Sequence, residues 1–305
     1  MYKFKKILVC LDYTEMDYYL IDYARFIVKT FKAEKLTFIH VMEAYNIPEE
    51  LTDSLEDPGV DLKDLIREEL KDRVDSGISG KDGVKPELVV EEGLTTEKIL
   101  QYSRKDKTDL CILGKKAGYS GKGGVARKMV GLLPCSVLVV SETSRTELKK
   151  LLVRMDFSDM AGASLLMARS ISEYSGASIE CHHVYKLPLN YFPRNNPDNV
   201  KRMKSQLGRF VKREYEKFIK KLKIDDPPQI SYSMEIHTDE SQLLYHHAIK
   251  NNVDLILTGT KIKSPLANLI LDSTSEKLVG AEKNIPVMVV KDKNKSANIL
   301  KSIFG

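Results

Sequence analysis

The most constraining feature of this 305-residue sequence is an internal duplication. When the chain is aligned with itself at an offset of 144, residues 5–16 (KKILVCLDYTEM) pair with residues 149–160 (KKLLVRMDFSDM). Near the end of each copy the match returns at an offset of 145, where 109–114 (DLCILG) pairs with 254–259 (DLILTG). A period of this length is that of a whole domain rather than of a solenoid unit. The sequence therefore predicts two homologous domains.

A short polar stretch, SETSRT at 141–146, separates the two copies and has the composition of a linker. We expect domain 1 to span residues 1–143 and domain 2 to span residues 147–292. A basic C-terminal tail, residues 293–305, follows.

Within each copy, short apolar runs alternate with longer segments of helical periodicity. Domain 1 has strand-like runs at 6–11, 35–41, 86–91, 109–113 and 135–140, with helical segments at 17–31, 61–76, 95–104 and 123–132 between them. This alternation predicts a parallel sheet with helices on both faces. In such sheets ligands bind beyond the carboxyl ends of the strands, where the strand order reverses.

The composition, 42% hydrophobic and 30% charged, is that of a globular protein. The apolar runs fall far short of the roughly 18 residues of a membrane-spanning helix, and no signal-peptide pattern opens the sequence. The net charge of +5 is too small to indicate nucleic acid. We therefore expect a cytoplasmic protein that binds neither membranes nor nucleic acid.

Chemistry-bearing side chains form no catalytic or metal-binding pattern. The four cysteines lack CxxC spacing and three lie in apolar strand-like runs, so we expect reduced core residues. The histidines show neither HxxxH nor HExxH spacing, and no GxSxG motif occurs. We therefore predict no metal ligand and no catalytic residue.

A glycine-rich segment, GYSGKGG at 118–124, follows the fourth strand-like run of domain 1. Backbone N–H groups from Gly121 to Gly124, the positive end of the next helix and the Lys122 side chain would together favour an anion such as phosphate. The spacing is not that of a Walker A loop, and the segment follows the wrong strand for a dinucleotide fingerprint, so NAD binding is not expected. A surface loop without a ligand is an equally good interpretation.

Asp12 and Asp156 end the first strand of each copy at equivalent positions. A carboxylate there could accept hydrogen bonds from an exocyclic amine or a ribose hydroxyl. It could also cap the following helix together with Thr14 or Ser158. The residues alone leave both interpretations open.

Taken together, these motifs resemble the universal stress protein family, here as a tandem two-domain member. The resemblance rests on a first strand ending in Asp, a second strand ending in His-Val (40–41 and 183–184), the Asp-Leu fourth strand, and PCSVLVV at 134–140. It implies an α/β fold of two repeated flavodoxin/Rossmann-like domains, each a five-stranded parallel sheet of order 3-2-1-4-5 with helices on both faces. It also implies that the domains pair as an intramolecular pseudo-dimer.

Nucleotide-binding members of that family carry a Gly-2x-Gly-9x-Gly-Ser/Thr motif after the fourth strand, so the resemblance implies an adenine-nucleotide site. Asp and Val at the strand ends would face adenine or ribose, while the glycines and Ser273 would face phosphates. The candidate binding residues are Asp12, Tyr13, Val41, Gly114, Gly121, Lys122, Gly123, Gly124, Asp156, Val184, Gly259 and Ser273.

Both copies depart from the glycine motif. In domain 1 Ala117 replaces the second glycine and the spacer is shorter, although glycines at 118 and 121 are added. In domain 2 Ile262 and Asp272 replace glycines, and Asp272 adds a charge that repels phosphate. We therefore expect domain 1 to bind the nucleotide and domain 2 to be impaired.

The resulting hypothesis is a stress-response protein that binds ATP, with or without Mg²⁺, as a regulatory ligand. One alternative is a slow ATP-hydrolysing or nucleotidyl-transferring enzyme, for which only Asp272, Glu276 and Lys122 are suitably placed in the sequence. The other is an interaction scaffold that binds no nucleotide.

The second helical region of each copy carries a different charge. Residues 201–223 hold ten basic and two acidic side chains, whereas residues 49–75 hold eleven acidic and four basic ones. An apolar set at helical spacing in 201–223, which includes Phe210, predicts an amphipathic helix with a solvated basic face. The alternative is salt-sensitive head-to-tail self-association, or docking of an anionic partner on the basic helix.

Overall fold

A computed structural model of the chain describes residues 4–43, 62–78, 83–115, 124–186, 197–235, 238–260, 273–281 and 284–291. These residues form two compact units, and the main division falls between Thr146 and Glu147. No helix in the described part of the chain is long and apolar enough to cross a membrane.

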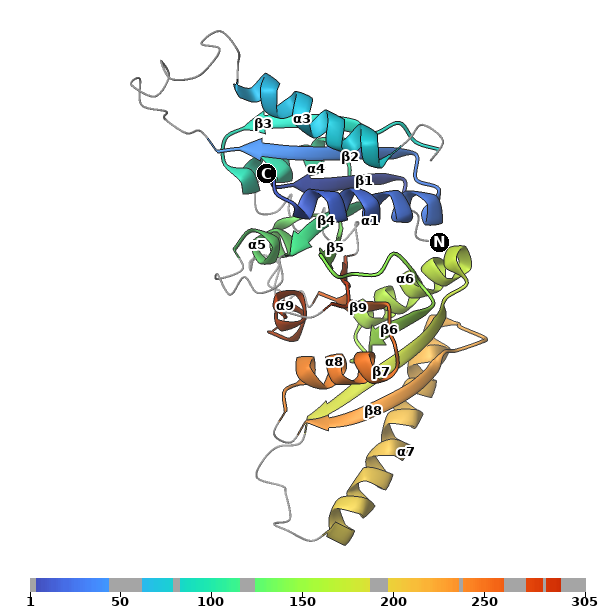
Figure 1. The fold of residues 1–305 in the computed structure, drawn as a ribbon. Helices are drawn as coiled ribbons and strands as arrows, with labels where there is room; N and C mark the ends of the chain where they lie inside the picture. The colour runs from blue at the N-terminus through green and yellow to red at the C-terminus, as the bar shows by residue number, and fades with distance from the viewer. Residues whose placement is uncertain are drawn as a thin grey trace, which may run out of the picture. The chain divides into compact units, whose positions relative to one another are not determined.

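Domain 1 contains a parallel sheet of the predicted strand order, 3-2-1-4-5 (Figure 1). Its strands are β1 (Lys6–Leu11), β2 (Lys35–Met42), β3 (Glu87–Glu92), β4 (Leu110–Lys115) and β5 (Ser136–Ser141). The central strands are almost entirely buried, because helices cover both of their faces. The order reverses between β1 and β4, which is where a ligand is expected.

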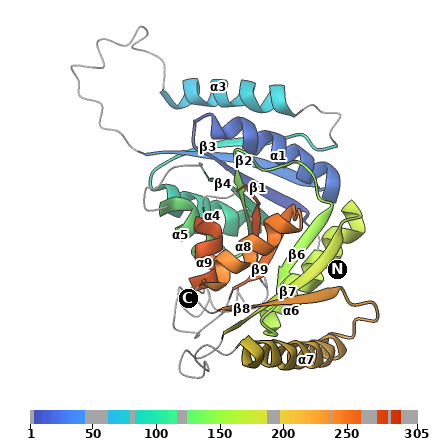
Figure 2. The same cartoon turned by 60° about the horizontal axis from the view of Figure 1, so that its bottom comes forward.

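Four described helices cover this sheet. On one face lie α1 (Met16–Phe31) and α3 (Leu62–Gly77), and on the other lie α4 (Thr95–Asp106) and α5 (Gly124–Leu132) (Figure 2). Helix α1 presents a row of buried apolar side chains that includes Leu20, Ile27 and Phe31, in agreement with its helical periodicity.

Domain 2 repeats this architecture, with the order β8-β7-β6-β9-β10. Its strands are β6 (Lys150–Arg154), β7 (Ser178–Lys186), β8 (Gln229–Glu235), β9 (Leu255–Gly259) and β10 (Val287–Val290). Its described helices are α6 (Asp159–Ser175), α7 (Pro197–Leu222), α8 (Glu240–Lys250) and α9 (Ser273–Gly280). The predicted fold of two α/β repeats with parallel sheets is thus confirmed.

One repeated motif has a structural explanation. The carboxylate of Asp109 accepts hydrogen bonds of 2.9 Å from the backbone N–H groups of Lys5 and Lys6. In domain 2 the carboxylate of Asp254 accepts the equivalent bonds from residues 149 and 150, at 2.8 and 2.9 Å. This acid joins the first and fourth strands at their amino ends, opposite the edge where a ligand is expected.

Helix α7 is amphipathic, as predicted. Its buried side chains include Leu207, Val211 and Phe218. Phe210, however, belongs to the predicted apolar set and is 40% exposed, with the Arg213 guanidinium 5.8 Å from the centre of its ring. The prediction failed for this residue because Phe210 lies at the edge of the apolar stripe, beside the basic face.

Candidate functional site

The turn after β1 places Asp12 and Tyr13 at the carboxyl edge of the sheet. One carboxylate oxygen of Asp12 accepts hydrogen bonds from the backbone N–H and the hydroxyl of Thr14, at 3.2 and 2.5 Å. Tyr13 has a positive φ of 61°, which reverses the chain direction before α1 begins. The Asp12 carboxylate therefore stabilises this turn.

The same turn occurs in domain 2. There Asp156 accepts from the N–H and hydroxyl of Ser158, at 3.0 and 2.5 Å, and Phe157 has a φ of 59°. Ser158 also caps α6 by accepting from the N–H of Ala161. The two acids thus make equivalent turn contacts in both domains. The predicted cap is present in domain 2, whereas Glu15, the N-cap residue of α1, makes no side-chain capping hydrogen bond.

A buried acid, Asp17, supports the domain 1 turn. Its carboxylate accepts a hydrogen bond of 3.0 Å from the backbone N–H of Asp12 and lies 3.5 Å from a guanidinium nitrogen of Arg73 on α3. Burial raises the pKa of Asp17 to about 6. Arg73 in turn lies over the Tyr13 ring, 4.8 Å from its centre. Through these Arg73 contacts, helix α3 packs against the turn.

His40 joins the ends of the first two strands. Its Nδ1 donates to the backbone carbonyl of Leu11 at 3.1 Å, and burial lowers its pKa. His183 makes the equivalent bond to the carbonyl of Met155 at 2.7 Å. The His-Val signature in the sequence therefore marks a structural histidine at the carboxyl edge of each sheet.

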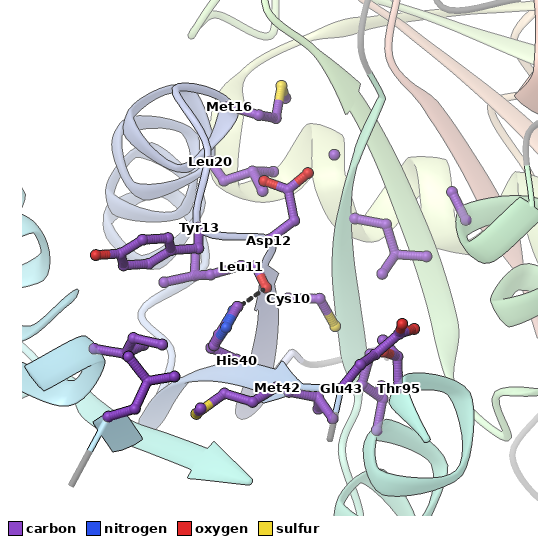
Figure 3. A pocket seen from close by; sticks show the side chains of 17 residues that line it. Cys10, Leu11, Asp12, Tyr13, Met16, Leu20, His40, Met42, Glu43 and Thr95 are labelled. Carbon is purple, nitrogen blue, oxygen red and sulfur yellow. Dashed lines mark hydrogen bonds between the residues drawn. The ribbon is translucent and has the colours of Figure 1, made fainter. Parts of the chain in front are cut away.

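A cavity of about 490 Å³ opens at this edge of domain 1, where β1, β2 and β4 end (Figure 3). Its lining comes from three strands, four helices and the segments that follow β1 and β2. It consists of Cys10, Leu11, Asp12, Tyr13, Met16, Leu20, His40, Val41, Met42, Glu43, Leu62, Ile66, Thr95, Ile99, Leu113, Gly114 and Ala126. Its volume and largely apolar lining are those of a site for a small organic ligand.

The lining includes Asp12, Tyr13, Val41 and Gly114 from the predicted set. Gly124 begins α5, whose Ala126 also lines the cavity. The other candidates in the glycine-rich segment, Gly121, Lys122 and Gly123, lie outside the described residues.

Sequence reasoning did not identify the lining from the helices, such as Met16, Leu20 and Thr95, nor Cys10 on β1. Cys10 is a partly exposed cavity residue, so the expectation that the cysteines are core residues is wrong for it. For Met16 and Leu20 the sequence carries no signal, because apolar helix residues serve equally well in a core.

Among the described lining residues, the charged side chains are the acids Asp12 and Glu43. Carboxylates accept hydrogen bonds from amines and hydroxyls, and they repel phosphate. The described part of the cavity is therefore chemically suited to a base or a sugar rather than to an anion.

Comparison with known proteins identifies the fold. The model of the universal stress protein family matches residues 3–141 and again residues 147–291. The chain belongs to the universal stress protein family.

Solved structures agree with this assignment at the level of the fold. A universal stress protein from Archaeoglobus fulgidus is 16% identical, with a TM-score of 0.63 over 95% of this chain and 98% of that chain. A functionally unknown protein from Pseudomonas aeruginosa is 14% identical, with a TM-score of 0.63 over 98% of this chain and 96% of that chain. No curated protein matches the sequence.

The first glycine of the universal stress protein motif has a packing role in both domains. A Cβ atom on Gly114 would lie 2.8 Å from Cγ of Met16, and one on Gly259 would lie 2.7 Å from the Met160 carbonyl oxygen. Both distances are shorter than van der Waals contact. These glycines allow the first helix of each domain to pack against the fourth strand.

The remaining domain 2 candidates occupy the corresponding edge. Val184 is buried near the end of β7, and Ser273 is the first residue of α9. The residues predicted to impair this universal stress protein domain, Ile262 and Asp272, lie outside the described residues. Within the described parts of the chain, no group of three or more His, Cys, Asp or Glu side chains is placed to hold a metal ion.

Proposed function

We propose that domain 1 binds an adenine nucleotide, ATP with or without Mg²⁺, as a regulatory ligand of a cytoplasmic stress response. The observation that carries this proposal is the 490 Å³ cavity at the β1/β4 switch point, because it adjoins four of the residues that the family resemblance assigns to the nucleotide.

The chemistry of the cavity supports a division of the ligand into two parts. The acids Asp12 and Glu43 suit the exocyclic amine of adenine and the ribose hydroxyls, and the apolar lining suits the base. The phosphates would lie toward the start of α5, where Gly121, Lys122 and Gly123 immediately precede the helix in sequence. The tandem repeat also supports the intramolecular pseudo-dimer.

Titration calorimetry of the full chain with ATP and Mg²⁺ tests the proposal. We expect one site per chain and at least a tenfold loss of affinity in Asp12→Ala. The matched control, Asp22→Ala, removes an exposed acid of α1 that pairs with Arg25 outside the cavity, and should bind as the unmodified chain does.

Absence of binding to the unmodified chain would refute the proposal and favour the scaffold alternative. Equal affinity in Asp12→Ala would refute the assigned site. Release of inorganic phosphate from bound ATP over hours would favour the enzymatic alternative instead.

A further inference from the structure

Domain 2 differs from domain 1 at two positions that line the domain 1 cavity. The offset of 144 residues places Arg154 of β6 where domain 1 has Cys10 of β1. The offset of 145 residues places Glu240, the first residue of α8, where domain 1 has Thr95, the first residue of α4. Two small side chains of a cavity wall are thus replaced by two long charged ones.

The two replacements contact each other in the interior. Nε of Arg154 lies 2.5 Å from Oε1 of Glu240, and the two residues are only 5% and 7% exposed. The other oxygen of Glu240 accepts a hydrogen bond of 2.8 Å from the hydroxyl of Thr274 on α9. Nζ of Lys186, at the end of β7, lies 3.6 Å from the same oxygen.

These contacts join the elements that would surround a ligand. We name Arg154, Glu240 and Thr274 the Arg154 cluster. It links β6, α8 and α9, the counterparts of β1, α4 and α5 around the domain 1 cavity, and α8 and α9 also pack against each other (Figure 2). Arg154 and Glu240 hold the positions equivalent to Cys10 and Thr95, which line the cavity of domain 1.

We propose that the Arg154 cluster is a built-in occupant of the second ligand site: it fills domain 2 with the protein's own side chains and restricts nucleotide binding to domain 1. The inference rests on the proposed function for its choice of ligand. It gives domain 2 a structural role, and it depends on described residues rather than on Asp272.

The energetics of the buried ion pair favour a domain 2 site that stays closed to ligands. Removing one member of a buried ion pair leaves the other charge buried without its partner, which is strongly unfavourable, whereas removing both together is tolerated. A ligand entering domain 2 would have to separate the pair and to break the contact between Glu240 and Thr274. Two coordinated substitutions, in contrast, should open the site.

The test uses the full chain carrying Ile262→Gly and Asp272→Gly, which remove the two replacements expected to impair domain 2, and compares two double variants in that background. Arg154→Cys with Glu240→Thr gives domain 2 the residues of domain 1. Arg213→Cys with Glu214→Thr makes the same changes of residue type in a pair on α7 that lies 4.0 Å apart and is more exposed, away from the cluster. The first readout is the number of ATP sites by calorimetry, and the second is amide hydrogen exchange in the first turn of α9 without ligand.

We expect the first variant to bind two ATP molecules per chain and the α7 variant to bind one. The first turn of α9 should exchange at least tenfold faster in the first variant and should be unchanged in the α7 variant. A single site in the first variant, or loss of the original site there, would overturn the inference.

If no variant binds ATP, the proposed function fails and the exchange result decides the inference by itself. Faster exchange in the first variant alone supports closure of domain 2 by the cluster, and unchanged exchange refutes it.

Discussion

The carboxylate of Asp17 accepts a hydrogen bond of 3.0 Å from the backbone N–H of Asp12, so a fully buried acid holds the residue proposed to face the ligand. Domain 2 has Ala161 at the corresponding position. The support that Asp17 and Arg73 give to the turn is thus specific to domain 1.

Replacement of Asp17 by alanine should therefore weaken domain 1. The N–H of Asp12 would lose its acceptor and Arg73 would lose a buried partner, which should lower the free energy of unfolding by about 1–3 kcal/mol. Asp17→Asn retains an acceptor oxygen and should cost less. Urea unfolding at pH 7 measures the free energy of unfolding of both variants. Equal stability of the unmodified chain and Asp17→Ala would show that Asp17 does not support the turn.

The pKa of Asp17 also predicts a pH dependence. Because burial raises its pKa from 3.8 to about 6, the folded state binds the proton more tightly than the unfolded state does. The contribution of this group to stability is therefore highest at low pH and falls as the pH rises through 6. Between pH 4.5 and pH 7 the unmodified chain should lose about 2 kcal/mol relative to Asp17→Asn. The opposite sign would show that Asp17 is stabilised as a carboxylate.

The contribution of His182, in domain 2, to stability should change with pH in the opposite direction. His182 is buried on β7, its two ring nitrogens contact the hydroxyls of Ser231 and Ser233 at 2.8 and 2.9 Å, and its ring stacks on that of His247. Glu180 faces the same cluster through a 2.7 Å contact with Nε2 of His247. Burial lowers the pKa of His182 from 6.5 to about 3.

Since the unfolded state then binds the proton more tightly, the contribution of His182 is present above pH 6.5 and is lost as the pH falls. The chain should lose about 2 kcal/mol between pH 7 and pH 5 through this group. Urea unfolding of His182→Gln should show a correspondingly smaller loss. An identical pH profile in that variant would mean that His182 is not kept neutral.

The fold was predictable because each strand is a short apolar run and each helix has its own periodicity. Apolar runs alternate with helical segments along the chain, and this alternation locates the ends of β1, β2 and β4. Asp12, Val41 and Gly114 could therefore be assigned to one edge of the sheet. The part of the cavity wall that comes from the helices could not be predicted. Met16 and Thr95 line the cavity only because of the way their helices pack on the sheet.

Contacts between residues that are far apart in the sequence could not be predicted either. Arg154 and Glu240 are 86 residues apart, and no motif in the sequence pairs them. The duplication contains the relevant comparison, since it aligns them with Cys10 and Thr95. Only their contact in the folded domain shows that the two substitutions belong together.

The alternative hypothesis for α7, salt-sensitive self-association through its basic face, can be tested directly. Lys212, Arg213 and Lys220 are among its exposed cations, whereas residues 49–75 are strongly acidic. On that hypothesis, sedimentation velocity should show a larger species at low ionic strength that dissociates above about 0.3 M salt, where the screening length is well below the roughly 10 Å that it has at 0.1 M. A mass independent of salt and concentration would leave α7 as a solvated helix.

Cys10 provides the most direct test of nucleotide binding in the domain 1 cavity. It lines the cavity and is partly exposed, whereas Cys111, Cys135 and Cys181 are buried. Iodoacetamide should therefore alkylate Cys10 first in the native chain, as located by mass spectrometry of peptides. Cys10→Ser is the control for background labelling.

Saturating ATP with Mg²⁺ should slow alkylation of Cys10 at least fivefold, because the bound nucleotide would cover the thiol. If Cys10 reacts at the same rate with and without ATP, the domain 1 cavity is not the nucleotide site.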